Sequence, residues 1–383
     1  MIEAAVEAEV GRLVGIGQLP AAADLLERSI PPAGDDPAPW LQLGGLRRAS
    51  GQPRRALDAV NQALAISPLD FMALVMKAGL VERLGEGDAG LEWDQALAQR
   101  PAGELPGPLA AAVAAGEQVR DRWQAARDQR LAAAAADSEA AADVDEQARI
   151  ARFRSNLLRR TRPFHSEPTH FHFPGLVERE FHPRSRFAWL AELEQATATI
   201  RAEMQAVAAS ERAELEPYVQ YQPHEALAQW RGLNHNRDWT AIHLSRQGRR
   251  IEANARHCPA TMALLARIGQ PDIAGASPNA MFSLLAPHTV IPPHVGVNNA
   301  RLVCHLPLVV PPDCWFRVGA ETRPWREGEA FVFDDTIEHE AANPSDQLRV
   351  VLIFDLWHPD LSPVERSAVA AMVAADGDQS AGL

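Results

Sequence analysis

The stretch that decides the fold is residues 281–359, which read MFSLLAPHTVIPPHVGVNNARLVCHLPLVVPPDCWFRVGAETRPWREGEAFVFDDTIEHEAANPSDQLRVVLIFDLWHP. It contains short apolar runs bounded by turn-forming residues or polar loops, namely residues 302–310, 330–333 and 350–356. Runs of this kind are typical of strands in an antiparallel sandwich or barrel. His294 and His339 follow turn or loop signals beside these runs, where imidazoles reach the mouth of a barrel and can bind a metal ion.

The bulk composition is that of a globular protein, with 46% hydrophobic and 23% charged residues in a chain of 383. This length allows two or three domains. The formal net charge of −13 argues against nonspecific binding to nucleic acid or to an anionic membrane. No apolar run is long enough to span a bilayer, and the first twenty residues carry acids where a signal peptide needs bases. We therefore expect a soluble, cytoplasmic protein.

Cysteine usage excludes two classes of stabilised fold. The three cysteines, Cys258, Cys304 and Cys314, form no CxxC pair, and their number is odd. Neither a disulfide framework nor a cysteine zinc site is therefore expected.

An internal repeat with a period of 34 residues occupies residues 1–101, marked by Gly17, Gly51 and Gly85. Residues 40–47, WLQLGGLR, match three positions of the signature W-x2-L-G-x2-Y and have Arg in place of its Tyr. This region therefore resembles about three tetratricopeptide units, each a pair of helices that buries its apolar face by stacking on its neighbours. Such an array would hold a peptide or a partner protein, whereas the simpler alternatives are a generic helical bundle or a dimerisation element.

The chain after the repeats divides into two further regions. Residues 102–162 are rich in Ala, Glu, Arg and Gln, and no proline interrupts 109–162, which favours one or two long polar helices acting as a linker. Residues 163–383 are expected to form the third, β-rich domain. The predicted fold class is thus multidomain, with all-α repeats, a helical linker and a C-terminal β domain.

A second group of histidines opens this last region. His165, His170, His172 and His182 lie in PFHSEPTHFHFPGLVEREFHP. Several histidines in a short segment suggest a metal site. The segment is broken by prolines, however, and an extended crossing segment would show the same alternation, so we favour a structural role.

The spacing around His294 departs from the usual iron(II) oxygenase pattern. That pattern is HxD or HxE followed by a distant His, whereas this chain reads His294-Val295-Gly296. Two imidazoles from different strand ends can still bind a divalent ion and leave coordination positions open for other ligands. Asp334 and Asp335 are alternative carboxylates, but their place before His339 favours a role in capping the loop.

Three segments of this region resemble the aspartyl/asparaginyl β-hydroxylase family, whose members are 2-oxoglutarate-dependent iron(II) oxygenases on a double-stranded β-helix. The segments are PPHVGVNNARLVCHLPLVVP, WREGEAFVFDDTIEHE and LRVVLIFDLWHPDLSPVER. The resemblance is specific over about residues 281–366, weaker over 163–280 and absent from the repeats. That family holds its iron with two histidines and no protein carboxylate, which suits Gly296.

The resemblance implies roles for individual residues. His294 and His339 would be the iron ligands, and Arg349 would pair with the distal carboxylate of 2-oxoglutarate through its bidentate guanidinium. Ser283 matches a serine that binds the same carboxylate, and His305 matches a histidine near the other end of this cosubstrate.

One position departs from the family pattern. Where an arginine commonly precedes that histidine by two residues, this chain has Val303. Strand alternation places Arg301, Val303 and His305 on one face, so we expect Arg301 to reach the same pocket from further along the strand. Trp239 and Arg249 match a segment that the family uses near the substrate mouth.

The function that the resemblance implies is hydroxylation of an unactivated C–H bond with Fe(II), 2-oxoglutarate and O2, which yields succinate and CO2. The expected substrate is the β-carbon of an Asp or Asn residue in a peptide or protein. Alternatives are a hydroxylase of a small or carrier-bound amino acid or of a lipid acyl chain, and a non-catalytic repeat adaptor whose β domain binds a metal or a small acid.

Overall fold

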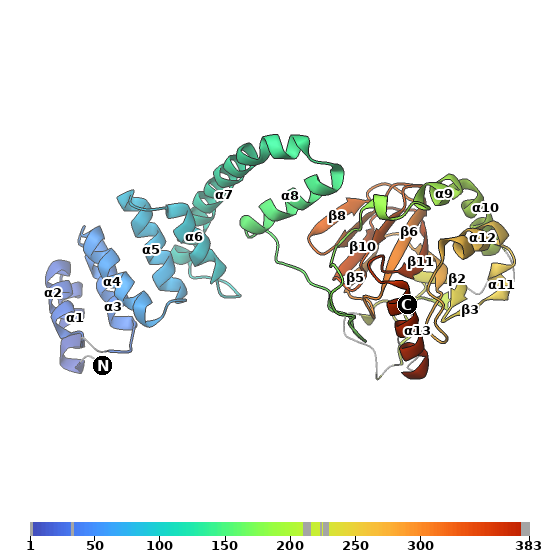
Figure 1. Ribbon diagram of the computed structural model, residues 1–383. Coiled ribbons are helices and arrows are strands. Elements are labelled where there is room, and N and C mark those ends of the chain that lie inside the picture. The colour runs from blue at the N-terminus through green and yellow to red at the C-terminus, as the bar shows by residue number, and fades with distance from the viewer. Residues whose placement is uncertain (1–2, 32–33, 210–215, 223, 225–229, 377–383) are drawn as a thin grey trace. The chain divides into compact units, whose positions relative to one another are not determined.

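The computed structural model describes residues 3–31, 34–209, 216–222, 224 and 230–376 (Figure 1). The chain divides into two compact units, Met1–Ala141 and Ala142–Leu383. The division falls within the predicted linker, residues 102–162.

The first unit consists of helices along its described residues. They are α1 (Ala4–Gly15), α2 (Leu19–Ser29), α3 (Ala38–Ala49), α4 (Pro53–Ile66), α5 (Phe71–Leu84), α6 (Ala89–Ala98) and α7 (Gly107–Ala141). The glycines of the 34-residue period lie where α1, α3 and α5 end, and each has a positive φ, at 76°, 74° and 65° for Gly17, Gly51 and Gly85. Because glycine adopts this left-handed conformation without a steric penalty, the period marks the end of the first helix of each pair.

Small residues allow the helices of this unit to approach closely. A Cβ atom at Gly116 of α7 would lie 2.2 Å from the Trp93 ring of α6, and one at Gly90 of α6 would lie 2.1 Å from Trp123 of α7. The two tryptophans therefore each cover a glycine of the opposite helix. Their indole N–H groups donate to carboxylates, Trp123 to Asp88 at 2.7 Å and Trp93 to Glu82 at 2.9 Å. The reciprocal contacts make α7 part of the packed helical unit.

Arg47 explains the departure from the tetratricopeptide signature. Its side chain is buried and pairs with Asp24 and Glu27 of the preceding helix α2. The position of the expected tyrosine is thus taken by a buried cation that links two successive helix pairs.

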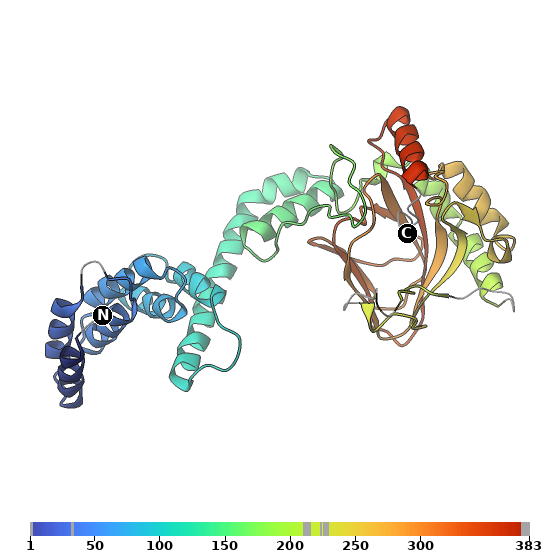
Figure 2. The same cartoon turned by 90° about the horizontal axis from the view of Figure 1, so that it is seen from below.

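The second unit is an antiparallel sandwich of two sheets (Figure 2). The large sheet has the order β1-β2-β4-β11-β6-β9 with β3 on β2, and comprises β1 (Glu216–Pro217), β2 (Trp239–Arg246), β3 (Arg249–Arg250), β4 (Ala280–Leu285), β6 (Arg301–Val309), β9 (Phe331–Phe333) and β11 (Arg349–Trp357). The small sheet has the order β5-β10-β7-β8, and comprises β5 (Thr289–His294), β10 (His339–Asn343), β7 (Trp315–Val318) and β8 (Glu321–Pro324). The three apolar runs of the sequence correspond to β6, β9 and β11, which confirms the β-rich prediction.

The large sheet is buried on both faces because its side chains alternate between two cores. On one face, Leu352 and Phe354 of β11 pack with helices α9 (Leu190–Gln195), α10 (Thr197–Ala208) and α12 (Pro259–Ile268). On the other face, Val351 and Ile353 meet the small sheet. Residues 350–354 of β11 therefore form a continuous apolar run, as strands covered on both sides do.

The first and the last helix of the second unit both pack against its other elements. Helix α8 (Val144–Leu157) is held to the sandwich by ion pairs from Arg152 to Glu180 and Glu321, and α13 (Pro363–Asp376) packs with the Ile273–Ala276 region through Val369. Across the described residues, none of the helices has the length and apolarity needed to cross a membrane.

Candidate active site

A cavity of about 330 Å³ opens between the two sheets of the second unit. Its walls take side chains from β2, β4, β6, β9 and β11 of the large sheet and from β5, β7 and β10 of the small sheet. This volume is in the range of pockets that hold small ligands. The cavity contains His294, His339, Arg349, Ser283, Arg301, His305 and Trp239, all of which were singled out in the sequence.

His294 and His339 face each other at one end of the small sheet. They are direct partners in the antiparallel pairing of β5 with β10, and their ring centroids lie 4.0 Å apart. Each ring is fixed by its own backbone: His294 Nδ1 lies 2.8 Å from the carbonyl of Pro292, and His339 Nδ1 lies 3.1 Å from that of Ile337. Because a carbonyl only accepts, each Nδ1 carries the proton, and each Nε2 is the basic nitrogen.

Burial keeps both rings uncharged. It lowers the pKa of His294 to about 3, with a further contribution from His339, and lowers the pKa of His339 to about 4. Metal ligation requires a neutral imidazole, and a carbonyl on the opposite ring nitrogen is the usual support for a ligating histidine. The pair is therefore prepared to bind a metal ion.

The donor set fits a metal held by two protein ligands. Among the described residues, no group of three or more His, Cys, Asp or Glu side chains is arranged to hold a metal ion. Two imidazole nitrogens suit iron and other first-row divalent ions, and the remaining positions would be left to non-protein ligands. The histidines at 165, 170, 172 and 182 do not gather into a second site.

Arg349 supplies a positive charge deep in the cavity. It opens β11, is 2% exposed, and has no carboxylate partner among the described residues. Burial lowers the pKa of its guanidinium to about 10, so the group is still charged at neutral pH. Its Cζ lies 5.3 Å from the ring centroid of Trp325, and its Nε has no hydrogen-bond partner within the described part of the chain. A buried cation in this state favours an anionic ligand that can accept its hydrogen bonds.

Ser283 lies on β4, the neighbouring strand of β11. Its partner across the sheet is Val351, two residues from Arg349. The indole N–H of Trp239 donates to Ser283 Oγ at 3.0 Å, which orients the hydroxyl within the cavity wall. Trp239 is thus placed in the cavity, as predicted from its segment.

His305 occupies the wall between the two sheets. Its ring stacks on Trp325 at a centroid distance of 5.4 Å and an angle of 11°. Burial, and after it the positive charge of Arg349, holds the pKa of His305 well below the usual value. The Nδ1 atom of His305 has no hydrogen-bond partner among the described residues. The ring is a neutral, rigidly held polar group.

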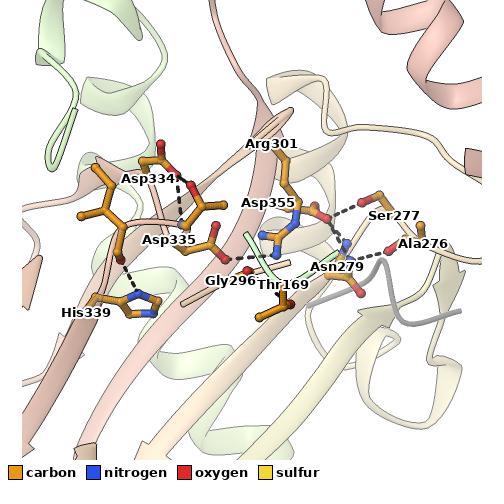
Figure 3. Close-up of polar contacts among 12 residues, drawn as sticks. Thr169, Ala276, Ser277, Asn279, Gly296, Arg301, Asp334, Asp335, His339 and Asp355 are labelled. Atoms are coloured by element: carbon orange, nitrogen blue, oxygen red, sulfur yellow. Dashed lines mark hydrogen bonds and ion pairs between the residues drawn. The ribbon is translucent and has the colours of Figure 1, made fainter. Parts of the chain in front are cut away.

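Arg301 reaches the cavity, but its main contact is a carboxylate. Its Nη2 donates to Asp335 Oδ2 at 3.1 Å, and both side chains are almost fully buried (Figure 3). The expectation that Asp335 caps the loop before His339 is therefore wrong, because its side chain pairs with Arg301. Asp334 caps this loop, because its Oδ1 accepts from the N–H and the hydroxyl of Thr336.

Asp335 also explains the glycine two residues after His294. A Cβ atom at Gly296 would lie 2.2 Å from Asp335 Oδ2, and Gly296 N donates to the Asp335 carbonyl at 2.6 Å. The space that a carboxylate side chain at position 296 would need is filled from the other loop.

An extended segment before the sandwich, residues 166–169, contacts both the loop that follows His294 and the loop that precedes His339. Thr169 N donates to the Gly296 carbonyl at 3.0 Å, and Glu167 N donates to the Thr336 carbonyl at 2.8 Å. The hydroxyls of Ser166 and Thr336 lie 2.6 Å apart. The loops of His294 and His339 are thus positioned by a segment far from both in sequence.

Arg249 is the one predicted site residue that the structure does not bring to the cavity. It is exposed on the two-residue strand β3. Its partner across the hairpin, Arg246, lines the cavity instead and pairs with Glu216 at 2.9 Å. The family resemblance is weak in this segment, so it could not decide which of the two paired arginines faces the cavity.

The aromatic side of the cavity, formed with Tyr218 and Trp230, was not predicted from the sequence. Tyr218 stacks flat on Trp239 at 3.8 Å, and Trp230 lies 5.0 Å from the ring of His294. A compositional signal was present, since Tyr218 and Tyr221 are the only tyrosines of the chain and both line this cavity.

Residues of the second unit are similar in sequence to known proteins. A family model described as Aspartyl/Asparaginyl beta-hydroxylase matches residues 194–359. Human "Aspartyl/asparaginyl beta-hydroxylase" is 37% identical over 142 residues, which cover 37% of this chain and 18% of the relative. "Aspartate beta-hydroxylase domain-containing protein 2" of Xenopus tropicalis is 32% identical over 218 residues, 56% of each chain.

The chain spans less than two thirds of the length of either relative, so these similarities concern part of each protein. Among solved structures, an oxidoreductase of the 2OG-Fe(II) oxygenase family from Burkholderia pseudomallei aligns with 13% identity and a TM-score of 0.29. The alignment covers 49% of this chain and 95% of that one. A similarity at this level is too low to establish a shared fold.

Proposed function

We propose, because residues 194–359 match the aspartyl/asparaginyl β-hydroxylase family, that this chain is a hydroxylase dependent on Fe(II), 2-oxoglutarate and O2. The proposed substrate position is the β-carbon of an Asp or Asn residue in a peptide or protein. Within this proposal the sandwich is the double-stranded β-helix of that family, and succinate and CO2 are the other products.

One observation carries the proposal. The two carbonyl-supported imidazoles, His294 and His339, share a cavity with Arg349, a buried guanidinium that lacks a carboxylate partner among the described residues. A metal ion and a dicarboxylate are the ligands that would satisfy these groups together.

The residues divide into binding and orienting roles. Nε2 of His294 and Nε2 of His339 would hold the iron. Arg349 and the Ser283 hydroxyl would bind the distal carboxylate of 2-oxoglutarate. With these bound, the iron would allow O2 to oxidise two compounds together, 2-oxoglutarate to succinate and CO2 and the C–H bond to C–OH, with one oxygen atom going to each product.

The remaining walls control the surroundings of the reaction. His305 and the neighbouring Phe316 and Phe333 line the cavity with groups that stay neutral. Tyr218 and Trp239 cover the opposite side as a stacked pair. Their contribution is to exclude water and to hold the reactants in one orientation.

The proposal is tested by succinate release from 2-oxoglutarate with Fe(II) and air. We expect release by the wild-type chain, and at least about 100-fold less by His294→Ala and by His339→Ala, because each removes one of two protein ligands. The iron affinity of both variants, measured by equilibrium dialysis, should also fall.

His288→Asn is the matched control. His288 is an exposed histidine that pairs with Asp346 at 2.7 Å, and Asn tolerates its positive φ of 54°. Turnover by this variant should equal that of the wild type. Equal turnover and iron binding by the His294 and His339 variants would contradict the assignment, and no succinate from any of the proteins would favour a non-catalytic adaptor.

A further inference from the structure

The cavity carries its arginines at separate places along the β6–β11 pair. Arg349 opens β11 opposite the end of β6, whereas Arg301 begins β6 and pairs with Trp357 at the other end of β11. Arg349 lacks a carboxylate partner among the described residues. Arg301 has Asp335 at 3.1 Å, and the buried carboxylate of Asp355 also acts on it electrostatically. Of these two ends, the Arg349 end therefore has the uncompensated positive charge.

The Arg301 end presents unused donors beside an unused acceptor. Arg301 Nε and Nη1 and Asp335 Oδ1 are buried and have no hydrogen-bond partner among the described residues. Buried polar atoms without partners are rare in native proteins, and in a ligand cavity they mark where a ligand is to bind. Figure 3 shows the guanidinium of Arg301 beside Asp335 and Asp355.

We propose that Arg301 and Asp335 together recognise a primary carboxamide, so that the enzyme selects an asparaginyl over an aspartyl side chain. This inference rests on the proposed function. The amide oxygen would accept from Arg301, and the amide NH2 would donate to Asp335 Oδ1. A carboxylate offers only acceptors and would face Asp335 as a like charge.

No further cation among the described lining residues offsets Asp335. Val303, which lies between Arg301 and His305 on the same face of β6, is apolar and lines the cavity. Arg246, the third arginine among the described lining residues, is exposed and already paired with Glu216. Once 2-oxoglutarate occupies the Arg349 end, the rest of the cavity favours an uncharged polar side chain.

The test compares two probes that differ only in the side-chain group, N-acetyl-L-asparagine methylamide and N-acetyl-L-aspartate methylamide. Binding to the full-length chain is measured by saturation-transfer NMR with Zn(II) and 2-oxoglutarate present, so that no turnover is required. We expect the asparagine probe to bind at least about tenfold more tightly, since a site built for hydrogen-bonding groups rejects an analogue that leaves them unpaired.

The variant Asp335→Asn reverses the polarity of the site. Its amide oxygen can still accept from Arg301 while its NH2 faces the cavity, so the preference should shift to the aspartate probe. Asp335→Ala should bring the two affinities to within about threefold. Asp334→Asn is the matched control, because Asp334 is the buried neighbour of Asp335, bonds to Thr336 and does not line the cavity.

Three results would overturn the inference: equal or tighter binding of the aspartate probe to the wild type, an unchanged preference in a folded Asp335→Asn variant, or no saturable binding of either probe. Thermal unfolding identifies variants that are not folded, and Asp335→Ala then provides the second comparison. Succinate release is measured separately. An asparagine preference without succinate release would support the recognition site and reject the proposed reaction.

Discussion

At the scale of single residues, position 296 shows how the loop before His339 determines which residue fits in the loop after His294. Gly296 stands where the common iron oxygenase motif has a carboxylate, and a side chain there is excluded by the Asp335 carboxylate from the opposite loop. Asp335 in turn is held by Arg301. The absence of a side chain at 296 and the presence of the Arg301–Asp335 pair are therefore one structural feature.

We expect Gly296→Ala to disturb the site through Asp335 and not through the backbone. The new Cβ would lie 2.2 Å from Asp335 Oδ2, so the carboxylate must move or the loop must shift. Overpacking of this kind costs about 1–3 kcal/mol of the free energy of unfolding. Urea unfolding measures this loss.

A double-mutant cycle separates this cause from others. Asp335→Ala removes the clash, so adding Gly296→Ala to that background should cost less than about 0.5 kcal/mol. An equal cost of Gly296→Ala in both backgrounds would show that Asp335 is not the obstacle.

Several residues that the structure brings into one cavity were identified in the sequence where a local rule was available. Pro292-Pro293 before His294, the polar loop before His339, and the place of Arg349 at the start of an apolar run are each visible in a few residues of sequence. Ser283 and His305 were found through family resemblance. The Arg301–Asp335 pair was not predictable, since its partners lie 34 residues apart and meet only when β6 and the loop before β10 are packed.

At the scale of elements, the crossing of α6 and α7 depends on two glycines covered by two tryptophans. We expect Gly116→Ala to destabilise the first unit by about 2 kcal/mol, because a Cβ atom 2.2 Å from the Trp93 ring displaces a buried side chain. Thermal and urea unfolding followed by circular dichroism report this change.

Gly45→Ala is the control for helix propensity. Gly45 lies inside α3, and a Cβ atom added there would have no neighbouring atom within 4 Å, so alanine should stabilise the unit by about 0.5–1 kcal/mol. Stabilisation by both alanines would contradict the proposed close packing of α6 on α7.

Two buried histidines, one in the segment before α9 and the other directly after β11, lie side by side. His182 and His358 lie 5.2 Å apart between ring centroids, and Nε2 of each has no partner among the described residues. Burial, followed by His358, lowers the pKa of His182 to about 3, and burial also lowers the pKa of His358. The other charged groups acting on this pair are Arg179, Arg186 and Asp360.

The pH dependence follows from these directions. A base with a folded pKa below its unfolded value of 6.5 binds more protons when unfolded, so its contribution to stability is complete above pH 6.5 and falls as the pH drops towards 3. For His182 the loss between pH 7.5 and pH 5 is ~2 kcal/mol. We expect His182→Phe to lose that much less stability over this interval than the wild type, as measured by urea unfolding at both values. Identical losses would show that His182 does not titrate in this way.

Elements with a strong local signal were predicted, and those that depend on their neighbours were not. The 34-residue glycine period located the ends of three helices, and the apolar runs located β6, β9 and β11. Strand β5 was not predicted because it contains Pro292-Pro293. It lies at the edge of the small sheet, and its register with β10 shifts where the two prolines lie; edges and irregular positions are where a sheet tolerates proline.

At the scale of the whole molecule, the division at Ala141 allows the two units to be tested separately. We expect residues 142–383 to fold alone, since the ion pairs of α8 with Glu180 and Glu321 lie within this unit. Succinate release without a protein substrate should then stay within about twofold of the full chain.

The same truncation tests the proposed role of the helical unit in substrate binding. If that unit docks the protein substrate, its removal should raise KM for the protein and leave KM for a short peptide unchanged. An unchanged KM for the protein would remove the docking role, and a truncated chain that fails to fold would contradict the independence of the units.

The central place of β11 in the large sheet also has a consequence for biosynthesis. This strand lies between β4 and β6, yet follows every other described strand in the chain. A chain made from its N-terminus therefore displays β4 and β6 as two unpaired edges until Arg349–Trp357 has emerged, and exposed edges of apolar strands promote aggregation. A nonsense or frameshift change before Arg349 would thus be expected to yield insoluble protein, in addition to removing the buried Arg349 guanidinium.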